Sequence, residues 1–446
     1  MRRYFGTDGI RGKAEMFSYD FLERIIRGLE VKNKSVLIGG DTRESTEEIL
    51  RNLTKLLKDY GAKKVGELGV FPTPGINIVM KTLCYDFAID VTASHNPYTD
   101  NGIKIFEFDG KNAQKLNDEG RERIERTLAN DSLSRPLPEE EVATEIVDEK
   151  NCGLDIYKKH LASSLGLTSL AKLRILIDCA NGATGVISGE VFREHGAEVK
   201  TINDDRSFGR KINDGVGSTH IEELQKQVRV GEFDCGAAFD GDGDRCIMVD
   251  ENGEIVDGDQ MLAIIANYFG LDKIVGTVMA NQGLINWGKE ADVEVILADV
   301  GDQNVAKMMK ERDVRIGGEQ SGHIILPDED MGDGMLTALT IAKILAETKR
   351  PLSELALIIK KSPQTMVNAP ANRTQKELLK TSEKVRAIID DFGQKLKDVN
   401  GRLLVRPSGT EELVRITLWG ESQPVIDELG KELATKLMEV FTNGRN

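Results

Sequence analysis

The sequence has few cysteines and no long apolar run. Its five cysteines are odd in number and widely spaced, so they support neither a disulfide framework nor a Cys-x-x-Cys metal site. No stretch approaches the roughly 18 apolar residues of a membrane-spanning helix, and the first residues, MRRYFGTDGIRG, contain no apolar signal segment. We therefore expect a cytoplasmic protein whose cysteines are reduced thiols in the core.

Positive charge is also scarce. The chain has 59 Lys and Arg residues against 74 Asp and Glu residues, a net charge of −15, and it has no dense basic cluster of the kind that contacts nucleic-acid phosphates. Neither nucleic acid nor a membrane is therefore an expected partner. Against this acidic background, places where Arg or Lys stand beside Gly, Ser and Thr are candidate sites for a small anion.

Short β-branched runs alternate with amphipathic helical patterns along the 446 residues, which predicts α/β layers with parallel or mixed sheets. The strand candidates are residues 35–38, 87–92, 173–179, 197–202, 235–239, 273–279 and 293–298. The helix candidates are residues 47–60, 221–230, 260–269 and 332–347. Towards the C-terminus, helical patterns at 376–396 and 423–440 flank apolar segments at 402–405 and 413–418, which predicts a smaller α+β domain.

Three stretches begin in a similar way: SVLIGGDTR, RILIDCANG and DKIVGTVMANQG each give an apolar strand and then a polar, glycine-containing turn. Three related units fit the length, which predicts two to four domains. Composition places connections at residues 128–150, 250–253 and 361–373. We predict three related α/β domains with mixed sheets at residues 1–145, 146–250 and 251–361, and a smaller C-terminal α+β domain at residues 362–446.

A candidate nucleophile follows the strand expected at residues 87–92. In TASHNPYTDNGIKI, Ser94 is surrounded by short polar residues that favour turns. Taken alone, such a serine is most often part of a surface turn in which the hydroxyl binds its own backbone. Other stretches of the chain favour the catalytic interpretation.

The most specific pattern is AFDGDGDRCIMVD, in which Asp240, Asp242 and Asp244 alternate with glycines after an apolar strand. A tight turn would allow the three carboxylates to converge on one hard cation such as Mg²⁺. The alternatives are a solvated acidic turn and a calcium-binding EF-hand loop. Arg245 occupies the position where that loop needs glycine, and a strand pattern follows in place of a helix. Arg245 would instead suit a phosphate shared with the metal.

Two further loops carry polar side chains. In GGEQSGHIIL, Glu319, Ser321 and His323 alternate, so on an extended backbone they would face the same way and bind a polar substrate, although an exposed strand edge is the alternative. In VRPSGTEELVRI, a strand ends at Arg406, and Ser408, Gly409 and Thr410 offer hydroxyl and N–H groups for a phosphate. A plain turn is the alternative there, and the GxxxxGK[ST] pattern of a P-loop is absent.

Two isolated cations complete the candidate set. Arg11 lies in FGTDGIRG, and Lys104 follows ten residues after Ser94. Either would ordinarily be a surface cation, but in an acidic protein with an implied phosphate both become candidates for binding it.

TASHNP, DGDGDR, GEQSGH and RPSGTE, in this order, resemble the α-D-phosphohexomutase superfamily over nearly the full chain. Within it, FGTDGIRG, Gln320 and VRPSGTE are most similar to phosphoglucosamine mutases. The resemblance implies four domains that each contribute one loop to a central cleft, the fourth acting as a mobile lid. Two positions depart from the pattern: Gln303 replaces an expected arginine in VGDQNV, and Glu412 replaces a usual proline.

The resemblance also implies a reaction. Ser94 would carry a phosphoryl group, and Mg²⁺ would be bound by that phosphate together with Asp240, Asp242 and Asp244. Glucosamine 6-phosphate and glucosamine 1-phosphate would interconvert through a 1,6-bisphosphate. Phosphoryl transfer depends mainly on positioning and electrostatics. By the same resemblance, the phosphate that does not react would be bound by Arg406, Ser408, Gly409 and Thr410. Sugar hydroxyls would be bound by Glu319 and Ser321. Charge stabilisation or proton transfer would come from Lys104, Arg11, His323 and Arg245.

Alternatives remain open for the substrate, the activity and the assembly. Because Gln303 replaces an arginine expected in phosphoglucosamine mutases, a phosphoglucomutase or phosphomannomutase is the main alternative. A catalytically silent sugar-phosphate binding protein is the other. The superfamily contains monomers and dimers, so a homodimer is possible.

Overall fold

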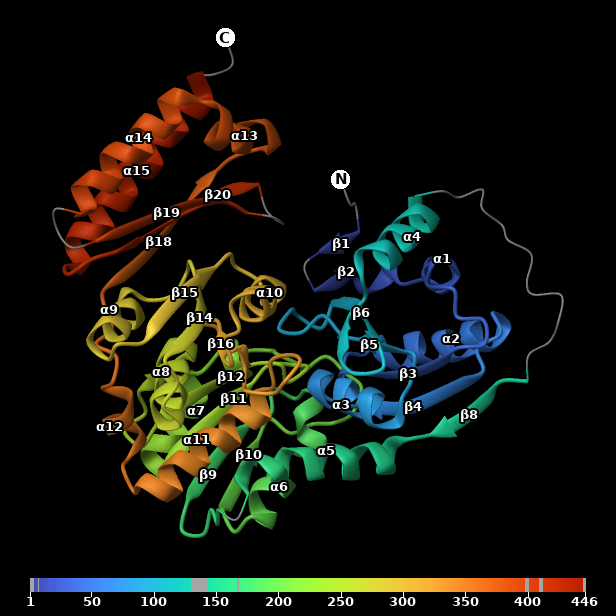
Figure 1. Cartoon of the computed structure of the whole chain (residues 1–446). Helices are drawn as coiled ribbons and strands as arrows, with labels where there is room; N and C mark the ends of the chain where they lie inside the picture. The colour runs from blue at the N-terminus through green and yellow to red at the C-terminus, as the bar shows by residue number, and fades with distance from the viewer. Residues whose placement is uncertain are drawn as a thin grey trace.

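The computed structural model describes residues 4–6, 8–129, 143–166, 168–397, 401–408 and 412–443. Three sheets of mixed strand direction and one small antiparallel sheet follow one another along the chain (Figure 1). The predicted fold class, three α/β domains with mixed sheets and a smaller C-terminal domain, is therefore confirmed. Within the described ranges, no helix is both long and apolar enough to cross a membrane.

The first sheet is built around a strand that is buried on both faces. Its strands are β1 (Phe5–Gly6), β2 (Gly9–Lys13), β3 (Ser35–Gly40), β4 (Lys64–Val70), β5 (Phe87–Val91), β6 (Asp100–Phe108), β7 (Ala113–Lys115) and β8 (Glu145–Asp148). Their order is β1-β2-β6-β5-β3-β4-β8, with β7 paired to β6. The continuous apolar run of β3 is what a central strand covered by helices on both faces requires.

Helices cover both faces of this sheet. They are α1 (Tyr19–Leu29), α2 (Thr46–Asp59), α3 (Thr73–Leu83) and α4 (Asp118–Ala129), with a short 3₁₀ turn, η1 (Ala14–Met16). Buried residues of α1, α2 and α4, such as Ile25, Leu53 and Ile124, form one core. Those of α3 belong to a second core that continues into the next units.

The second sheet consists of β9 (Arg174–Asp178), β10 (Glu198–Ile202), β11 (Cys235–Phe239), β12 (Cys246–Asp250) and β13 (Ile255–Val256). The third consists of β14 (Lys273–Thr277), β15 (Glu294–Ala298), β16 (Gly317–Gly318) and β17 (Ile324–Ile325). The orders β4-β3-β5-β6, β10-β9-β11-β12 and β15-β14-β16-β17 are equivalent. In each order, the second strand has two parallel neighbours and the fourth strand runs antiparallel to the third. This common arrangement supports the internal repeat expected from the sequence.

Most helices of these two units share one core with α3, whereas the helices at residues 222–231 and 302–312 pack in two smaller clusters. The helices of the two units are α5 (Lys150–Leu165), α6 (Ser188–Glu194), α7 (Glu222–Gly231), α8 (Gly258–Phe269), α9 (Gln282–Glu290), α10 (Asp302–Arg312), α11 (Gly334–Thr348) and α12 (Leu352–Ala356), with the 3₁₀ turns η2 (Ala183–Val186) and η3 (Gly217–Thr219). Val79 of α3, Tyr157 of α5 and Leu339 of α11 all belong to the shared core. Because α11 is buried on nearly all sides, its sequence is apolar all round.

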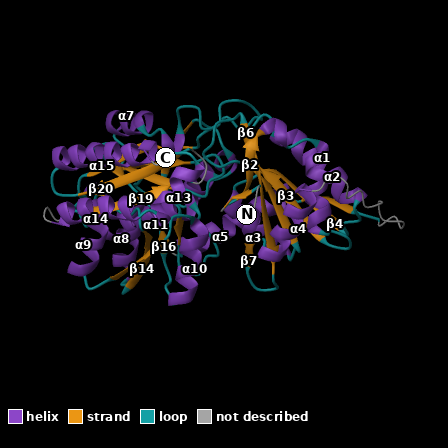
Figure 2. Cartoon of the chain, turned by 90° about the horizontal axis from the view of Figure 1, so that it is seen from above, coloured by secondary structure: helices purple, strands orange, loops and turns teal. Residues whose placement is uncertain are grey.

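The C-terminal domain has a core of its own. Its sheet orders β18 (Gln364–Pro370), β20 (Leu413–Trp419) and β19 (Arg402–Pro407), all antiparallel, and its helices are α13 (Arg373–Thr381), α14 (Glu383–Lys397) and α15 (Gln423–Asn443). Phe392, Ile416 and Leu433 pack in that core. Figures 1 and 2 show this domain over the third unit and away from α1 and α2.

Four details of the sequence prediction are wrong. The supposed connection at residues 361–373 contains β18, and the helix expected at 376–396 is two helices, α13 and α14, separated at Ser382, which has an extended backbone. Cys84 and Cys152 are exposed, whereas the other three cysteines are buried core thiols; all five are free. The acidic turn at 250–253 joins β12 to β13 within the second sheet.

Candidate active site

The predicted site loops occupy the same place in each α/β unit. The connection from the third strand to the antiparallel fourth carries Ser94 in the first unit, the three aspartates in the second and residues 319–323 in the third. Hydrogen bonds link these loops: Ser94 Oγ donates to Asp240 Oδ2, and the Cys246 N–H donates to the Gly322 carbonyl at 3.0 Å. The common topology therefore brings three distant motifs together.

Ser94 is fully buried and adopts a left-handed backbone conformation, with φ of 52°. Its N–H donates to Thr92 Oγ1 at 2.9 Å, and its hydroxyl donates to Asp240 Oδ2 at 2.6 Å. His95 Nδ1 lies 3.2 Å from the same hydroxyl. Burial, followed by the charges of Arg245 and Arg11, lowers the pKa of His95 to about 4, so a neutral imidazole accompanies the candidate nucleophile at pH 7.

A buried arginine that we did not predict holds the Ser94 loop. Arg43 Nη2 donates to the carbonyls of Ser94 at 2.7 Å and Asn96 at 2.9 Å, and its Nη1 donates to the carbonyls of Pro97 and Asp100. Its Nε donates to Asp41 Oδ2 at 2.8 Å, and both members of this ion pair are fully buried. Four loop carbonyls thus depend on one guanidinium group. Asn213 adds a further bond to the Ser94 carbonyl from the second unit, at 2.8 Å.

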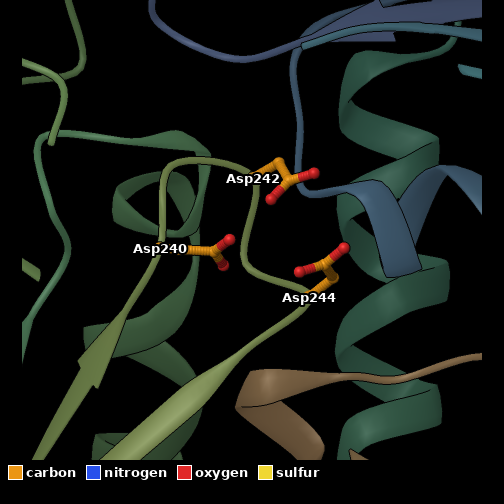
Figure 3. A group of neighbouring side chains, drawn as sticks. All are labelled: Asp240, Asp242 and Asp244. Atoms are coloured by element: carbon orange, nitrogen blue, oxygen red, sulfur yellow. The ribbon is translucent and has the colours of Figure 1, made fainter. Parts of the chain in front are cut away.

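The aspartate loop fits a hard divalent cation. Figure 3 shows Asp240, Asp242 and Asp244 on one loop between adjacent strands, and one oxygen from each lies within 4.8 Å of the others. Within the described residues, Oδ1 of both Asp242 and Asp244 is buried without a hydrogen-bond partner, a costly arrangement that a cation would relieve. Three carboxylates are the oxygen donors that Mg²⁺ prefers.

The carboxylates of this loop are crowded, and its glycines allow the tight turn expected from the sequence. Burial, together with the charges of Asp242 and Asp244, raises the pKa of Asp240 well above its ordinary value. Gly243 has φ of 76°, and a side chain on Gly241 would lie 2.8 Å from the Ser94 carbonyl. The alternating glycines therefore allow the turn and its close approach to the serine loop.

The side chain of Lys104 donates hydrogen bonds directly to the triad. Its Nζ donates to Asp242 Oδ2 at 2.6 Å and to Asp244 Oδ2 at 3.1 Å. Burial alone would lower the pKa of Lys104, but the charges of Asp242, Asp244 and Asp8 raise it well above its ordinary value. Lys104 is therefore a fixed positive charge at neutral pH.

Arg245 and Arg11 also lie beside the triad. Arg245 Nε is 3.8 Å from Asp244 Oδ1, and the Arg245 N–H donates to Asp240 Oδ1 at 3.2 Å. Arg11 pairs with Asp8, which also lies 3.1 Å from Lys104 Nζ. The sequence analysis missed Asp8, although it lies within the FGTDGIRG stretch.

The third loop is not the extended strand that the sequence suggested. Gly322 has φ of 89°, and its N–H donates to the Glu319 carbonyl at 2.9 Å, so residues 319–323 form a tight turn. Glu319 Oε1 accepts from the Gly301 N–H at 3.0 Å, Ser321 is exposed and His323 is buried. Neither ring nitrogen of His323 has a hydrogen-bond partner among the described residues.

The fourth loop is described only in part. Ser408 is buried, and its N–H donates to the Leu413 carbonyl at 2.9 Å, whereas Gly409 and Thr410 lie outside the described residues. Arg406 on β19 faces Arg415 on β20. Burial, and then the charge of Arg415, lowers the pKa of Arg406. Two cations in facing positions repel each other and favour an anion between them; Arg415 was not predicted.

Comparison with known proteins places these loops in a family. Profiles of the phosphoglucomutase/phosphomannomutase alpha/beta/alpha domains I, II and III match residues 2–135, 155–253 and 257–361, and that of the C-terminal domain matches residues 366–436. The chain is 37% identical to phosphoglucosamine mutase of Finegoldia magna, covering 98% of this chain and 99% of that protein. For phosphoglucosamine mutase of Clostridium tetani the identity is 38%, with coverages of 99% and 100%.

Solved structures share the fold. A phosphoglucomutase/phosphomannomutase family protein from Burkholderia thailandensis superposes with a TM-score of 0.77 at 22% identity, covering 99% of this chain and 98% of that one. N-acetylphosphoglucosamine mutase from Aspergillus fumigatus, solved in complex with GlcNAc-6P and magnesium, gives 0.70 at 17% identity, with coverages of 98% and 96%. With all four domains matched in order, the chain belongs to the phosphoglucomutase/phosphomannomutase family of the α-D-phosphohexomutase superfamily.

Proposed function

We propose that the protein is a phosphoglucosamine mutase, which interconverts glucosamine 6-phosphate and glucosamine 1-phosphate. The observation that carries the proposal is the 2.6 Å hydrogen bond from Ser94 to Asp240, which puts a buried hydroxyl against three convergent carboxylates. The identity of 37% and 38% to phosphoglucosamine mutases over almost the whole length supports the choice of sugar.

Ser94 carries the phosphoryl group in this mechanism. The bond between phosphorus and Ser94 Oγ breaks as a new bond forms to the free hydroxyl of the sugar monophosphate, giving the 1,6-bisphosphate. The bisphosphate turns over within the cleft and returns its other phosphoryl group to Ser94. Positioning and charge stabilisation supply most of the catalysis in such a transfer.

The cations and the histidine have different roles. Lys104 is already protonated, so it stabilises negative charge on the transferring group, with Arg11 and Arg245 beside it. His323 is buried with both ring nitrogens unpartnered among the described residues, and we assign it the proton that leaves the sugar hydroxyl. Asp240, Asp242 and Asp244 would hold Mg²⁺, which neutralises charge on the phosphoryl oxygens when bound.

The other two loops bind the ends of the substrate that do not react. Glu319 and Ser321 bind sugar hydroxyls, and Arg406 and Ser408 bind the second phosphate together with Gly409 and Thr410. Arg415, facing Arg406 across the sheet, supports a phosphate at that place. Because the intermediate must present each phosphate in turn, these loops need to accept the sugar in two orientations.

A phosphoglucomutase or phosphomannomutase is the second candidate, because Gln303 replaces the expected arginine close to the proposed sugar site. Gln303 lies at the start of α10, two residues after Gly301, whose N–H donates to Glu319. A coupled assay should compare glucosamine 1-phosphate with glucose and mannose 1-phosphates. A tenfold preference in kcat/KM for an unaminated sugar, about 1.4 kcal/mol, would reverse the assignment.

The intact mass of the purified protein provides a direct test of the serine. We expect an added phosphate on the wild-type chain and none on Ser94→Ala. A protein that binds these sugar phosphates but neither turns them over nor accepts phosphate from the 1,6-bisphosphate would be a silent binding protein instead.

A further inference from the structure

A line of ion pairs connects the third unit to the cations of the site. Lys115, at the end of β7, contacts Asp302, the first residue of α10, and also Oδ1 of Asp8. Oδ2 of Asp8 contacts Arg11 and, at 3.1 Å, Lys104. The side chains of Lys115, Asp8 and Asp302 are only 18%, 18% and 15% exposed, so solvent screens these pairs far less than surface pairs.

The start of α10 also contacts the loop at residues 319–323, which we call the sugar loop. The N–H of Gly301, adjacent to Asp302, donates to Glu319 Oε1 at 3.0 Å. Gly301 therefore bonds to Glu319, the residue proposed to bind sugar hydroxyls, and the adjacent Asp302 contacts the ion pairs around Lys104. No other part of the mechanism uses Lys115 or Asp302.

The charge balance around Asp8 gives Lys115 a second effect. Burial alone would raise the pKa of Asp8, but Lys104, Lys115 and Arg11 lower it well below its ordinary value. With three cations around one carboxylate, Asp8 offsets only part of the positive charge of Lys104. Without Lys115, Asp8 would be shared by only two cations and would draw Lys104 and Arg11 more strongly.

We infer that Lys115 is a positioning residue, which holds Lys104 and Arg11 in register with the sugar loop by bridging Asp8 and Asp302 across the two units. This inference rests on the proposed mutase function. Breaking the bridge leaves each half of the site able to bind its ligand, but it loosens the alignment between phosphoryl donor and sugar. Misalignment of this kind lowers the rate of transfer more than the affinity.

The chain offers a matched control for this bridge. Lys81 and Asp330 form another ion pair between the first and third units, with Nζ 2.9 Å from the carboxylate and side chains 37% and 21% exposed. Neither residue contacts Asp8 or the site cations in any contact that the structure describes. Lys81→Met therefore removes one lysine bridge between the same units without touching the network.

The test compares kcat in Lys115→Met, Lys115→Arg and Lys81→Met of the full-length enzyme. We expect Lys115→Met to lower kcat at least about tenfold, Lys115→Arg to recover most of the loss, and Lys81→Met to match wild type. Calorimetry in a Ser94→Ala background should give a Kd for glucosamine 6-phosphate within about threefold of that background when Lys115→Met is added. A merely structural role would instead lower thermal stability and affinity together.

Asp302→Asn completes the experiment as a double-mutant cycle. Because both residues act through one bridge, adding Asp302→Asn to Lys115→Met should reduce kcat no further, and additive losses would overturn the inference. An unchanged kcat in Lys115→Met would also overturn it, as would an equal loss in Lys81→Met. These outcomes are read against an active wild type; a wild type that turns over no hexose phosphate would instead overturn the proposed function and this inference together.

Discussion

Ser94 Oγ donates to Asp240 Oδ2 at 2.6 Å, although the two residues are 146 positions apart in the chain. The contact joins the hairpin loops of the first two units and places the hydroxyl at the edge of the aspartate cluster. A phosphoryl group on Ser94 would be attached where the carboxylates converge. The candidate nucleophile and the candidate metal ligands therefore form one site, whose parts can be tested separately.

Replacing Ser94 by alanine should abolish mutase turnover but leave binding of glucosamine 6-phosphate intact, because the variant lacks only the phosphoryl carrier. The measurements are a coupled turnover assay and calorimetry on the same preparation. Ser163→Ala, at an exposed position in α5, is the control and should behave as wild type. Near-normal turnover of Ser94→Ala would remove Ser94 from its proposed role.

Replacing Asp242 by asparagine should weaken Mg²⁺ binding and sharply reduce activity, since it removes a charge from a set of three buried carboxylates. Calorimetric titration of the whole protein with Mg²⁺ measures the first effect, and a rate measurement at fixed Mg²⁺ the second. Chelation should abolish wild-type activity and Mg²⁺ should restore it. Unchanged affinity and rate, as expected for the exposed control Asp328→Asn, would count against the triad as the metal site.

Replacing Arg43 by methionine should destabilise the protein by about 3 to 5 kcal/mol, because it leaves Asp41 buried without its ionic partner. Arg43→Lys keeps the charge but cannot donate to four loop carbonyls, so it should fold better and still have reduced kcat. Urea unfolding and turnover assays measure the two effects. Arg210→Met, which removes an exposed pair with Glu44, should leave stability nearly unchanged; an equally small effect of Arg43→Met would contradict the prediction.

Asp333 should make the protein less stable as the pH rises from about 4 to about 6. Burial raises the pKa of Asp333 to about 6, although the Leu336 N–H and the Tyr157 hydroxyl donate to it. In this pH range the folded state binds the proton more tightly than the unfolded state, so stability is lost as Asp333 ionises. The difference from the ordinary value of 3.8 corresponds to about 3 kcal/mol.

The urea midpoint of Asp333→Asn, compared with wild type at pH 4.5 and pH 7, tests this effect. The asparagine oxygen can still cap α11 while its NH₂ group donates to the Tyr157 hydroxyl, but the amide does not titrate, so the variant should gain stability relative to wild type at the higher pH. Asp328→Asn, at a side chain that is 87% exposed, should follow wild type at both. A constant difference between Asp333→Asn and wild type would show that Asp333 does not carry the pH dependence.

Local sequence patterns predicted the regular elements and the aspartate triad because their signal lies within a few residues. The apolar run of β11 and the alternating Asp and Gly after it determine both a strand and a turn. The turn at residues 319–323 was mistaken for a strand because β16 and β17 are two residues each, too short for periodicity to distinguish them from a turn. The extended strand β18 was missed because it begins beside Pro363 and ends at Pro370.

Residues that act through long-range contacts left no comparable signal. Lys115 and Asp302 are 187 positions apart, and Arg43 reaches carbonyls 51 to 57 residues away. Arg43 could have been suspected only because an arginine lies three residues after a strand that is buried on both faces. Arg415 can be recognised as a candidate phosphate ligand only from the register of β19 and β20, which places it opposite Arg406.

The left-handed backbone at Ser94 restricts which nucleophile this loop can carry. Asparagine, aspartate and glycine adopt such a conformation most readily, but none of them has a hydroxyl. Threonine has one, yet its branched β-carbon makes a φ near 52° a true outlier. The loop geometry therefore selects serine over threonine on conformational grounds, before any difference in reactivity between the two alcohols is considered.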